Sequence, residues 1–316
     1  MSTKHKGEQV TQSVPSIIYS MVVPGVDVVY LGLPFDRSSG LAGAEKGPEA
    51  IHHILDTQIE FYEPITGTTP RNNAVIAYEE IKKLNECSAE TMVKRVYNRH
   101  QKIANMGNPF IVGLGGDHSV SIGIFKSIAK TCSELGKQLP TILQIDAHFD
   151  LRESDEDFRK DPVGIYAHCS VMRRAAELGF PSVPVGIRSY SREEFEYACA
   201  HRDQIMPFRW NPDSTHPHHT PAPETIVDCI QTKDVYLTID IDGIDPSHMP
   251  ATGTPVQNGL SWSYTIELLK KLFKARNVIG MDIVEVAPPL GMTNITAYGA
   301  AQLTYMCIAL HQRTKS

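Results

Sequence analysis

Short apolar runs recur along the 316-residue chain, separated by stretches in which apolar positions follow a helical spacing. The runs are rich in β-branched residues and almost continuously hydrophobic, which is typical of strands that are covered on both faces. They predict buried strands at 26–34, 110–116, 141–146, 183–187, 235–242 and 278–284, with a weaker one at 74–79.

Helix signals lie between these runs. Pro48 suits the first turn of a helix, Ser88 can cap the start of another, and Gly107 and Gly136 are placed to end helices. The expected helices cover 47–55, 88–107, 119–136, 263–276 and 294–312. Alternation of strands and helices predicts an α/β fold whose parallel sheet carries helices on both faces. We expect a flexible polar arm at 1–16 and a single catalytic domain at 17–316, because no break in composition divides the chain.

Composition and charge argue against several classes of protein. The net charge is −6 and no long basic run occurs, which argues against nucleic-acid binding. No apolar stretch is long enough for a membrane span, and the polar N-terminus lacks the apolar core of a secretory signal. The six cysteines show no C-x-x-C spacing, so we expect free thiols and a cytoplasmic protein. The His-rich segment 214–220 is predicted to be an exposed loop.

Acidic residues and histidines gather where two of the predicted strands end. In an extended chain, Asp146, His148 and Asp150 of "LQIDAHFDLR" share one side of the strand. Asp240 and Asp242 repeat this pattern in "LTIDIDGIDP". Open α/β sheets bind their ligands at the carboxyl ends of the strands. Both clusters are therefore candidate site residues.

Electrostatics favours a pair of metal ions. Four carboxylates with no Lys or Arg among them would repel one another, and burying one unpaired carboxylate costs several kcal/mol. Two divalent cations would balance four carboxylates. A set of oxygen and imidazole ligands without thiolate favours Mn²⁺, although zinc, cobalt and nickel remain open. With the histidine of "VGLGGDHSV", the candidate ligands are His118, Asp146, His148, Asp150, Asp240 and Asp242.

Two other metal- or cofactor-binding interpretations fit the residues less well. The "GLGGD" turn lacks the G-x-G-x-x-G spacing of a dinucleotide site. The "DIDGIDP" segment lacks the glutamate that ends a calcium-binding loop.

Three motifs together resemble the ureohydrolase family, which includes arginase, agmatinase and their relatives. They are "GGDHS", "DAHFD" and "DIDGIDPSHMPATGTP", they occur in family order, and the resemblance runs from "GLPFD" near residue 32 to "DIVEVAP" at 282–288. It implies a three-layer α/β/α sandwich with a central, mostly parallel, eight-stranded sheet. It also implies two Mn²⁺ per subunit, hydrolysis of a guanidino compound to urea and an amine, and a homo-trimer or homo-hexamer.

The resemblance also implies roles for single residues. Glu285 corresponds to the glutamate that receives the guanidinium, His168 to a histidine near the nucleophile, and Asp150 is the expected proton relay. One ion would be held by His118, Asp146, Asp150 and Asp240, and the other by Asp146, His148, Asp240 and Asp242. The segment between Asp150 and His168 is longer than the family pattern, and Phe149 replaces a smaller residue, so the shape of the substrate pocket is expected to differ.

The sequence indicates the type of reaction more clearly than it indicates the substrate. Leu151, Arg152 and Glu153 follow the second motif, without the Asn pattern of arginase-type members. Segment 151–163 has five acids against three bases, which suits a cationic tail. We therefore expect agmatine hydrolysis to putrescine and urea, a step of polyamine biosynthesis. A guanidinobutyrase, in which Arg188 would meet a carboxylate tail, an arginase-type enzyme and a catalytically silent binding or regulatory subunit remain as alternatives.

Overall fold

The computed structural model describes residues 22–37, 41–157, 159–210 and 220–314. The expected N-terminal arm and residues 214–219 of the His-rich segment lie outside the described residues. In the part of the chain that the structure describes, no helix is both long and apolar enough to cross a membrane.

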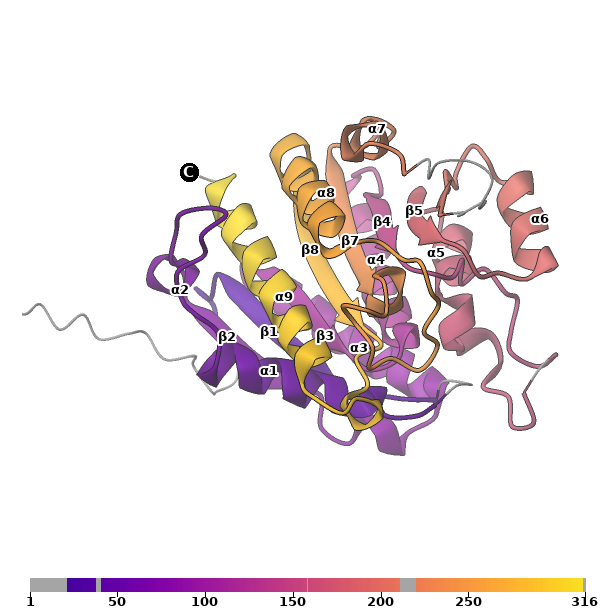
Figure 1. The fold of residues 1–316 in the computed structure, drawn as a ribbon, viewed down its shortest axis with the longest axis horizontal. Helices are drawn as coiled ribbons and strands as arrows, with labels where there is room; N and C mark the ends of the chain where they lie inside the picture. Colours follow the sequence, from indigo (N-terminus) through magenta and orange to yellow (C-terminus); the bar gives the residue numbers. More distant parts are fainter. Residues whose placement is uncertain (1–21, 38–40, 158, 211–219, 315–316) are drawn as a thin grey trace, which may run out of the picture.

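One eight-stranded parallel sheet runs through the described chain, in the order β2-β1-β3-β8-β7-β4-β5-β6 (Figure 1). Its strands are β1 (Val28–Leu33), β2 (Ile76–Glu80), β3 (Phe110–Gly115), β4 (Thr141–Ile145), β5 (Ser182–Ile187), β6 (Phe208–Arg209), β7 (Asp234–Asp240) and β8 (Asn277–Val284). All seven predicted strands are confirmed. The eighth, β6, has two residues and gives no period that a sequence pattern could reveal.

Helices cover both faces of the sheet, as the alternation predicts. Their bounds are α1 (Gly47–Thr57), α2 (Pro70–Asn73), α3 (Ala89–Ala104), α4 (Ser121–Leu135), α5 (Val171–Glu177), α6 (Arg192–Ala200), α7 (Pro223–Asp228), α8 (Trp262–Ala275) and α9 (Ile295–Arg313). One apolar core joins α1, α7, α8 and α9 to the sheet, and a second joins α3, α4 and α5 to the opposite face. The predicted three-layer fold is confirmed.

The helix ends follow the predicted signals. Ser88 accepts a hydrogen bond from the backbone N–H of Thr91 and caps α3. Gly136 adopts φ 60° at the end of α4, a conformation that favours glycine. Ser88 and Gly136 thus mark the start of α3 and the end of α4, as the sequence predicts.

The four central strands deliver the candidate site residues to one edge of the sheet. In spatial order these neighbours are β3, β8, β7 and β4, and all run parallel. Consequently the loops after all four strands meet at their common carboxyl edge. These loops carry the candidate ligands and Glu285, although the residues lie up to 167 positions apart in the sequence.

Candidate metal centre and active site

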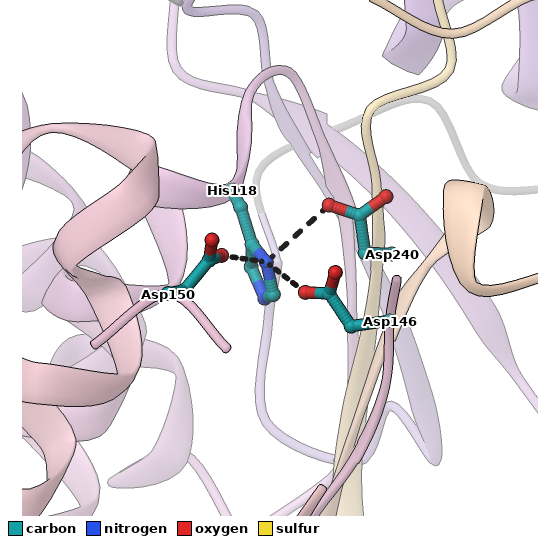
Figure 2. A group of neighbouring side chains, drawn as sticks. All are labelled: His118, Asp146, Asp150 and Asp240. Carbon is teal, nitrogen blue, oxygen red and sulfur yellow. Dashed lines mark ion pairs between the residues drawn. The ribbon is translucent and has the colours of Figure 1, made fainter. Parts of the chain in front are cut away.

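Four side chains form a fully buried inner group at this edge (Figure 2). His118 opens a short 3₁₀ helix, His118–Val120, directly after β3. Its Nδ1 lies 3.0 Å from an oxygen of Asp150 and 3.3 Å from an oxygen of Asp146. The same nitrogen lies 3.5 Å from an oxygen of Asp240. Three carboxylates thus converge on one imidazole nitrogen.

The other ring nitrogen of His118 determines what Nδ1 can do. Nε2 lies 2.9 Å from the hydroxyl of Thr238, and that hydroxyl donates to the buried carboxylate of Asp282. Nε2 must then carry the proton and donate it to Thr238. In neutral His118 the Nδ1 lone pair therefore faces the carboxylates, and Nδ1 is buried without a hydrogen-bond partner. A cation among these atoms would satisfy all of them.

A second, outer group contains Asp146, His148 and Asp242, and its histidine is partly exposed. His148 Nδ1 lies 3.1 Å from Asp242 Oδ2 and 3.6 Å from Asp146 Oδ1. One Asp146 oxygen therefore faces His118 and the other faces His148. Asp146 therefore belongs to both groups and would supply an oxygen to a cation in each.

Asp240 takes part in the inner group and supports the outer one through the backbone. Its Oδ2 faces His118, while its Oδ1 accepts a hydrogen bond of 3.0 Å from the backbone N–H of Asp242. The structure does not gather Asp240 among the outer ligand atoms. Its expected role as a second bridging ligand stays a prediction.

Backbone and hydroxyl donors position the outer carboxylate. Asp242 Oδ1 accepts from the backbone N–H of Ala147 at 3.0 Å, and Asp242 Oδ2 accepts from the Thr254 hydroxyl at 3.0 Å. Gly243 packs so closely that a Cβ there would lie 2.5 Å from the backbone nitrogen of Asp146. A residue without a side chain is needed for the two loops to approach this closely.

Burial and crowding shift the pKa values of the inner carboxyl groups. Burial raises the pKa of Asp240 well above its usual range, and the carboxylates of Asp242 and Asp146 raise it further. Burial, together with Asp146, raises the pKa of Asp150 to about 7. For His118, burial lowers the pKa, but the three surrounding carboxylates outweigh it and the pKa ends well above its usual value. Bound dications would favour the ionised carboxylates and the neutral imidazole, and so would reverse these shifts.

Glu285 and His168 form a pair beside the inner group. Glu285, which directly follows β8, accepts a hydrogen bond of 2.9 Å from the backbone N–H of His118 and lies 3.5 Å from His168 Nδ1. Burial lowers the pKa of His168, but Glu285 outweighs it and raises the pKa to about 9. Asp150 and Glu285 both have positive φ, at 54° and 63°. Such backbone strain is found at functional sites, where the surrounding structure maintains it.

A cavity of about 290 Å³ opens onto the outer group. The residues that line it include His148, Asp150 and Asp240 of the two groups, together with His168, Arg152, Ser189, Tyr190 and Glu194. Arg152 forms an ion pair of 3.0 Å with Asp157. Glu194 is buried and accepts hydrogen bonds from the backbone of neighbouring loops.

The prediction that Asp146, His148 and Asp150 share one side of an extended strand is wrong. β4 ends at Ile145, before the ligands begin, and Asp150 has positive φ. The side chains of His148 and Asp150 therefore face different groups instead of sharing one side. Asp240 and Asp242 also separate, because a 3₁₀ turn starts directly after β7. All six predicted ligands nevertheless lie within these two groups.

Arg188 does not have the substrate-binding position that the guanidinobutyrase alternative gave it. Its guanidinium donates only to backbone carbonyls, at distances from 2.6 to 3.2 Å.

Sequence reasoning missed the residues that support the ligands. Thr238 fixes the ring of His118, Thr254 holds Asp242, and Gln144 donates a hydrogen bond of 2.8 Å to Asp146. The two threonines lie in or beside quoted motifs. Their hydroxyls give no signal of their own, because Thr is common in strands and loops.

Comparisons with known proteins agree with this geometry. The model of the arginase family matches residues 26–309. An N(1)-aminopropylagmatine ureohydrolase from Synechocystis sp. is 31% identical over 284 residues, which cover 88% of this chain and 87% of that protein. An agmatinase from Bacillus anthracis is 31% identical, over 87% of this chain and 89% of that protein. A crystal structure described as a hypothetical agmatinase, from Burkholderia thailandensis, has a TM-score of 0.76 and 27% identity, covering 94% of this chain and 89% of that one.

Proposed function

Because this chain belongs to the arginase family, whose model matches 284 of its 316 residues (26–309), we propose that it is a binuclear manganese ureohydrolase that converts agmatine to putrescine and urea. The observation that carries the proposal is the pair of ligand groups that share Asp146, with His148, Asp150 and Asp240 lining a cavity and Glu285 bonded to the backbone of His118. Four carboxylates and two imidazoles suit two hard or borderline dications. The intact ligand set argues against a catalytically silent member.

The ligand sets divide between the two ions. His118, Asp150 and Asp240 would hold the inner ion, His148 and Asp242 the outer one, and Asp146 both. When bound, the two cations would supply Lewis acidity and lower the pKa of water towards neutrality, which provides a nucleophile.

The remaining residues of the site would bind and orient the substrate. A guanidinium is a planar cation, and the carboxylate of Glu285 can hold it through paired charge-assisted hydrogen bonds. The guanidino carbon would then lie beside the metal ligands, in a fixed orientation.

Proton transfer needs groups beside the reacting atoms. Asp150 lies at the inner group and can relay a proton towards the leaving nitrogen. His168 lines the same cavity and, as an imidazolium paired with Glu285, can deliver a proton to the departing amine.

The charges along the cavity support a substrate without a carboxylate. Among the described residues that line it, Arg152 is the single guanidinium, and it is paired with Asp157. All the N–H groups of nearby Arg188 are bound to backbone carbonyls. Arginine and 4-guanidinobutanoate would therefore bring a carboxylate to a wall with no uncommitted guanidinium, whereas an amine tail meets the hydroxyls of Ser189 and Tyr190 and the carboxylate of Glu194.

Urea release tests this proposal directly. The Mn²⁺-loaded protein would be assayed with agmatine, N(1)-aminopropylagmatine, arginine and 4-guanidinobutanoate. We expect kcat/KM to be highest for agmatine. Urea from none of the four would overturn the ureohydrolase proposal, and a preference for any of the other three substrates would overturn the assignment of agmatine. The expected cytoplasmic location and trimeric or hexameric assembly stay predictions, and light scattering coupled to gel filtration would test the assembly.

A further inference from the structure

The guanidinium of Arg188 is saturated by backbone carbonyls. Nε donates to the carbonyl of Gln257 at 3.0 Å. Nη1 donates to Gly186 at 2.9 Å and Gly243 at 3.2 Å. Nη2 donates to Asp242 at 2.6 Å and Val256 at 2.7 Å. An arginine has five N–H groups, and each of them finds a carbonyl here, so no donor remains for a ligand.

These contacts join segments that hold the outer ligands. The carbonyls belong to the end of β5, to the 3₁₀ turn Ile241–Gly243 and to the loop at 256–257. The backbone N–H of Arg188 also donates to the carbonyl of Ala147 at 2.8 Å, within the loop that follows β4. One residue therefore fixes the loop of Asp242 against the loop of His148.

In the described part of the chain, the hydrogen bonds of Arg188 involve Asp242 of the outer group and the loop that carries Thr254, but not His118 or Asp150 of the inner group. Asp242 is held on its main chain by Arg188 and on its side chain by Ala147 and Thr254. Thr254 lies two residues before the 256–257 carbonyls that Arg188 binds. Among the described residues, the Arg188 side chain forms no hydrogen bond with His118 or Asp150, and both are positioned by other elements.

A lysine could not replace this residue. Its ammonium has three donors at a single point, whereas the carbonyls here are arranged around a planar fork. At least two of the five carbonyls would lose their donor, and the turn and loop would no longer be fixed to each other. Removing groups that orient metal ligands in this way costs about 10–100-fold in metal affinity.

We propose that Arg188 is a positioning residue for the outer metal ion: it fixes the backbone of the Asp242 turn and of the loop that bears Thr254, and thereby sets the affinity of one of the two metals. This inference rests on the proposed binuclear centre and assigns Arg188 no contact with metal or substrate.

Metal binding to the apo protein tests the inference without any substrate. Mn²⁺ titration by calorimetry, with metal content measured after dialysis, would compare wild type with Arg188→Lys. We expect the outer ion, identified as the one that His148→Asn weakens, to lose about 10–100-fold in affinity, while the inner one stays within about twofold. Electron paramagnetic resonance at limiting Mn²⁺ would show an isolated ion in place of a coupled pair.

Two variants serve as controls. Arg276→Lys alters another guanidinium that donates to backbone carbonyls, those of Val227, Ile230 and Ala275, which lie in other segments of the chain. It should leave both metal affinities unchanged. In a His148→Asn background, which already weakens the outer ion, Arg188→Lys should cause no further loss at the remaining ion.

Several outcomes would overturn the proposal. Unchanged affinity for both ions in folded Arg188→Lys, or equal loss at both, would refute it. So would a higher KM confined to 4-guanidinobutanoate with metal binding intact, which would make Arg188 a substrate contact. If Arg188→Lys does not fold, Thr254→Val decides, because it removes only the loop's hydroxyl and must weaken the outer ion alone. A wild type that binds fewer than two ions would refute the binuclear centre itself.

Discussion

The inner and outer ligand groups share Asp146 but are built differently. The inner group is fully buried, and its atoms converge on His118, whose ring is fixed from behind by Thr238. The outer group has a partly exposed histidine beside the cavity, and its Asp242 is held through loop backbone. We therefore expect the outer ion to be the one whose affinity depends on the backbone around Asp242 and on the loop that carries Thr254.

Asp146→Asn would have the largest effect, because it removes the side chain common to both groups. Both ions should be lost, and kcat/KM should fall on the order of 10⁴-fold or more, as when a group that generates the nucleophile is removed. Metal content and urea release would check this. If the variant retained two ions, Asp146 would not be the shared ligand and the comparison would have no structural basis.

Glu285→Gln should separate substrate binding from metal binding. Glu285 contacts the inner group only through the backbone N–H of His118. Both ions should therefore remain, while the loss of a charged partner for the guanidinium lowers kcat/KM by about 10²-fold. Exposed Glu134→Gln, on α4, is the matched control and should match wild type. Loss of a metal ion in the Glu285 variant would contradict its assignment as a substrate contact.

His148→Asn tests whether the outer group binds its ion independently of the inner group. The outer ion should lose at least about 100-fold in affinity, because a direct ligand is removed and even outer-shell partners are worth about 10–100-fold, and the inner ion should keep its affinity. His118→Asn is the opposite case and should weaken the inner ion. Calorimetric titration of both variants would decide. Identical profiles would mean that the two groups act as one site.

His100 shows how burial changes the pKa of a histidine that lies outside the two ligand groups. It lies in α3 with Nδ1 2.8 Å from the Ser127 hydroxyl, and burial lowers its pKa to about 4. An unfolded histidine titrates near 6.5, so the stabilising effect of keeping it neutral is complete above pH 6.5. As the pH falls from 6.5 to 4, the unfolded chain takes up a proton that the folded one refuses, and about 3 kcal/mol is lost.

Urea unfolding of the metal-free protein from pH 7 to pH 4 would measure that loss. His100→Gln lacks the titrating group, so its stability should fall less steeply with acidification than that of wild type. Metal binding at pH 7 should not change in this variant. Parallel stability curves for the two proteins would show that His100 is protonated in the folded state.

The sequence predicted the sheet better than the loops. Continuous β-branched runs such as 235–242 mark central strands, because both faces of such strands are buried. The two residues of β6 carry no comparable signal. The gathering of the six candidate ligands could be predicted because four carboxylates need counter-charges wherever the loops place them. Their division into two groups could not, because it depends on the turn after β7 and on the positive φ of Asp150.

The residues that position the candidate ligands could not be predicted from the sequence either. Arg188 follows a strand, as a substrate-binding arginine would, and only the folded loops show that backbone carbonyls occupy its donors. Thr254 similarly gains its role from the distance between its hydroxyl and Asp242. Such contacts depend on tertiary structure, and no local pattern encodes them.

The most direct test is anomalous diffraction from crystals of the Mn²⁺-loaded protein, collected on both sides of the manganese absorption edge. The account predicts two manganese peaks, one beside Nδ1 of His118 and one beside Nδ1 of His148, with Asp146 between them. A single peak, or peaks away from these nitrogens, would contradict the claim that the six side chains form one binuclear centre.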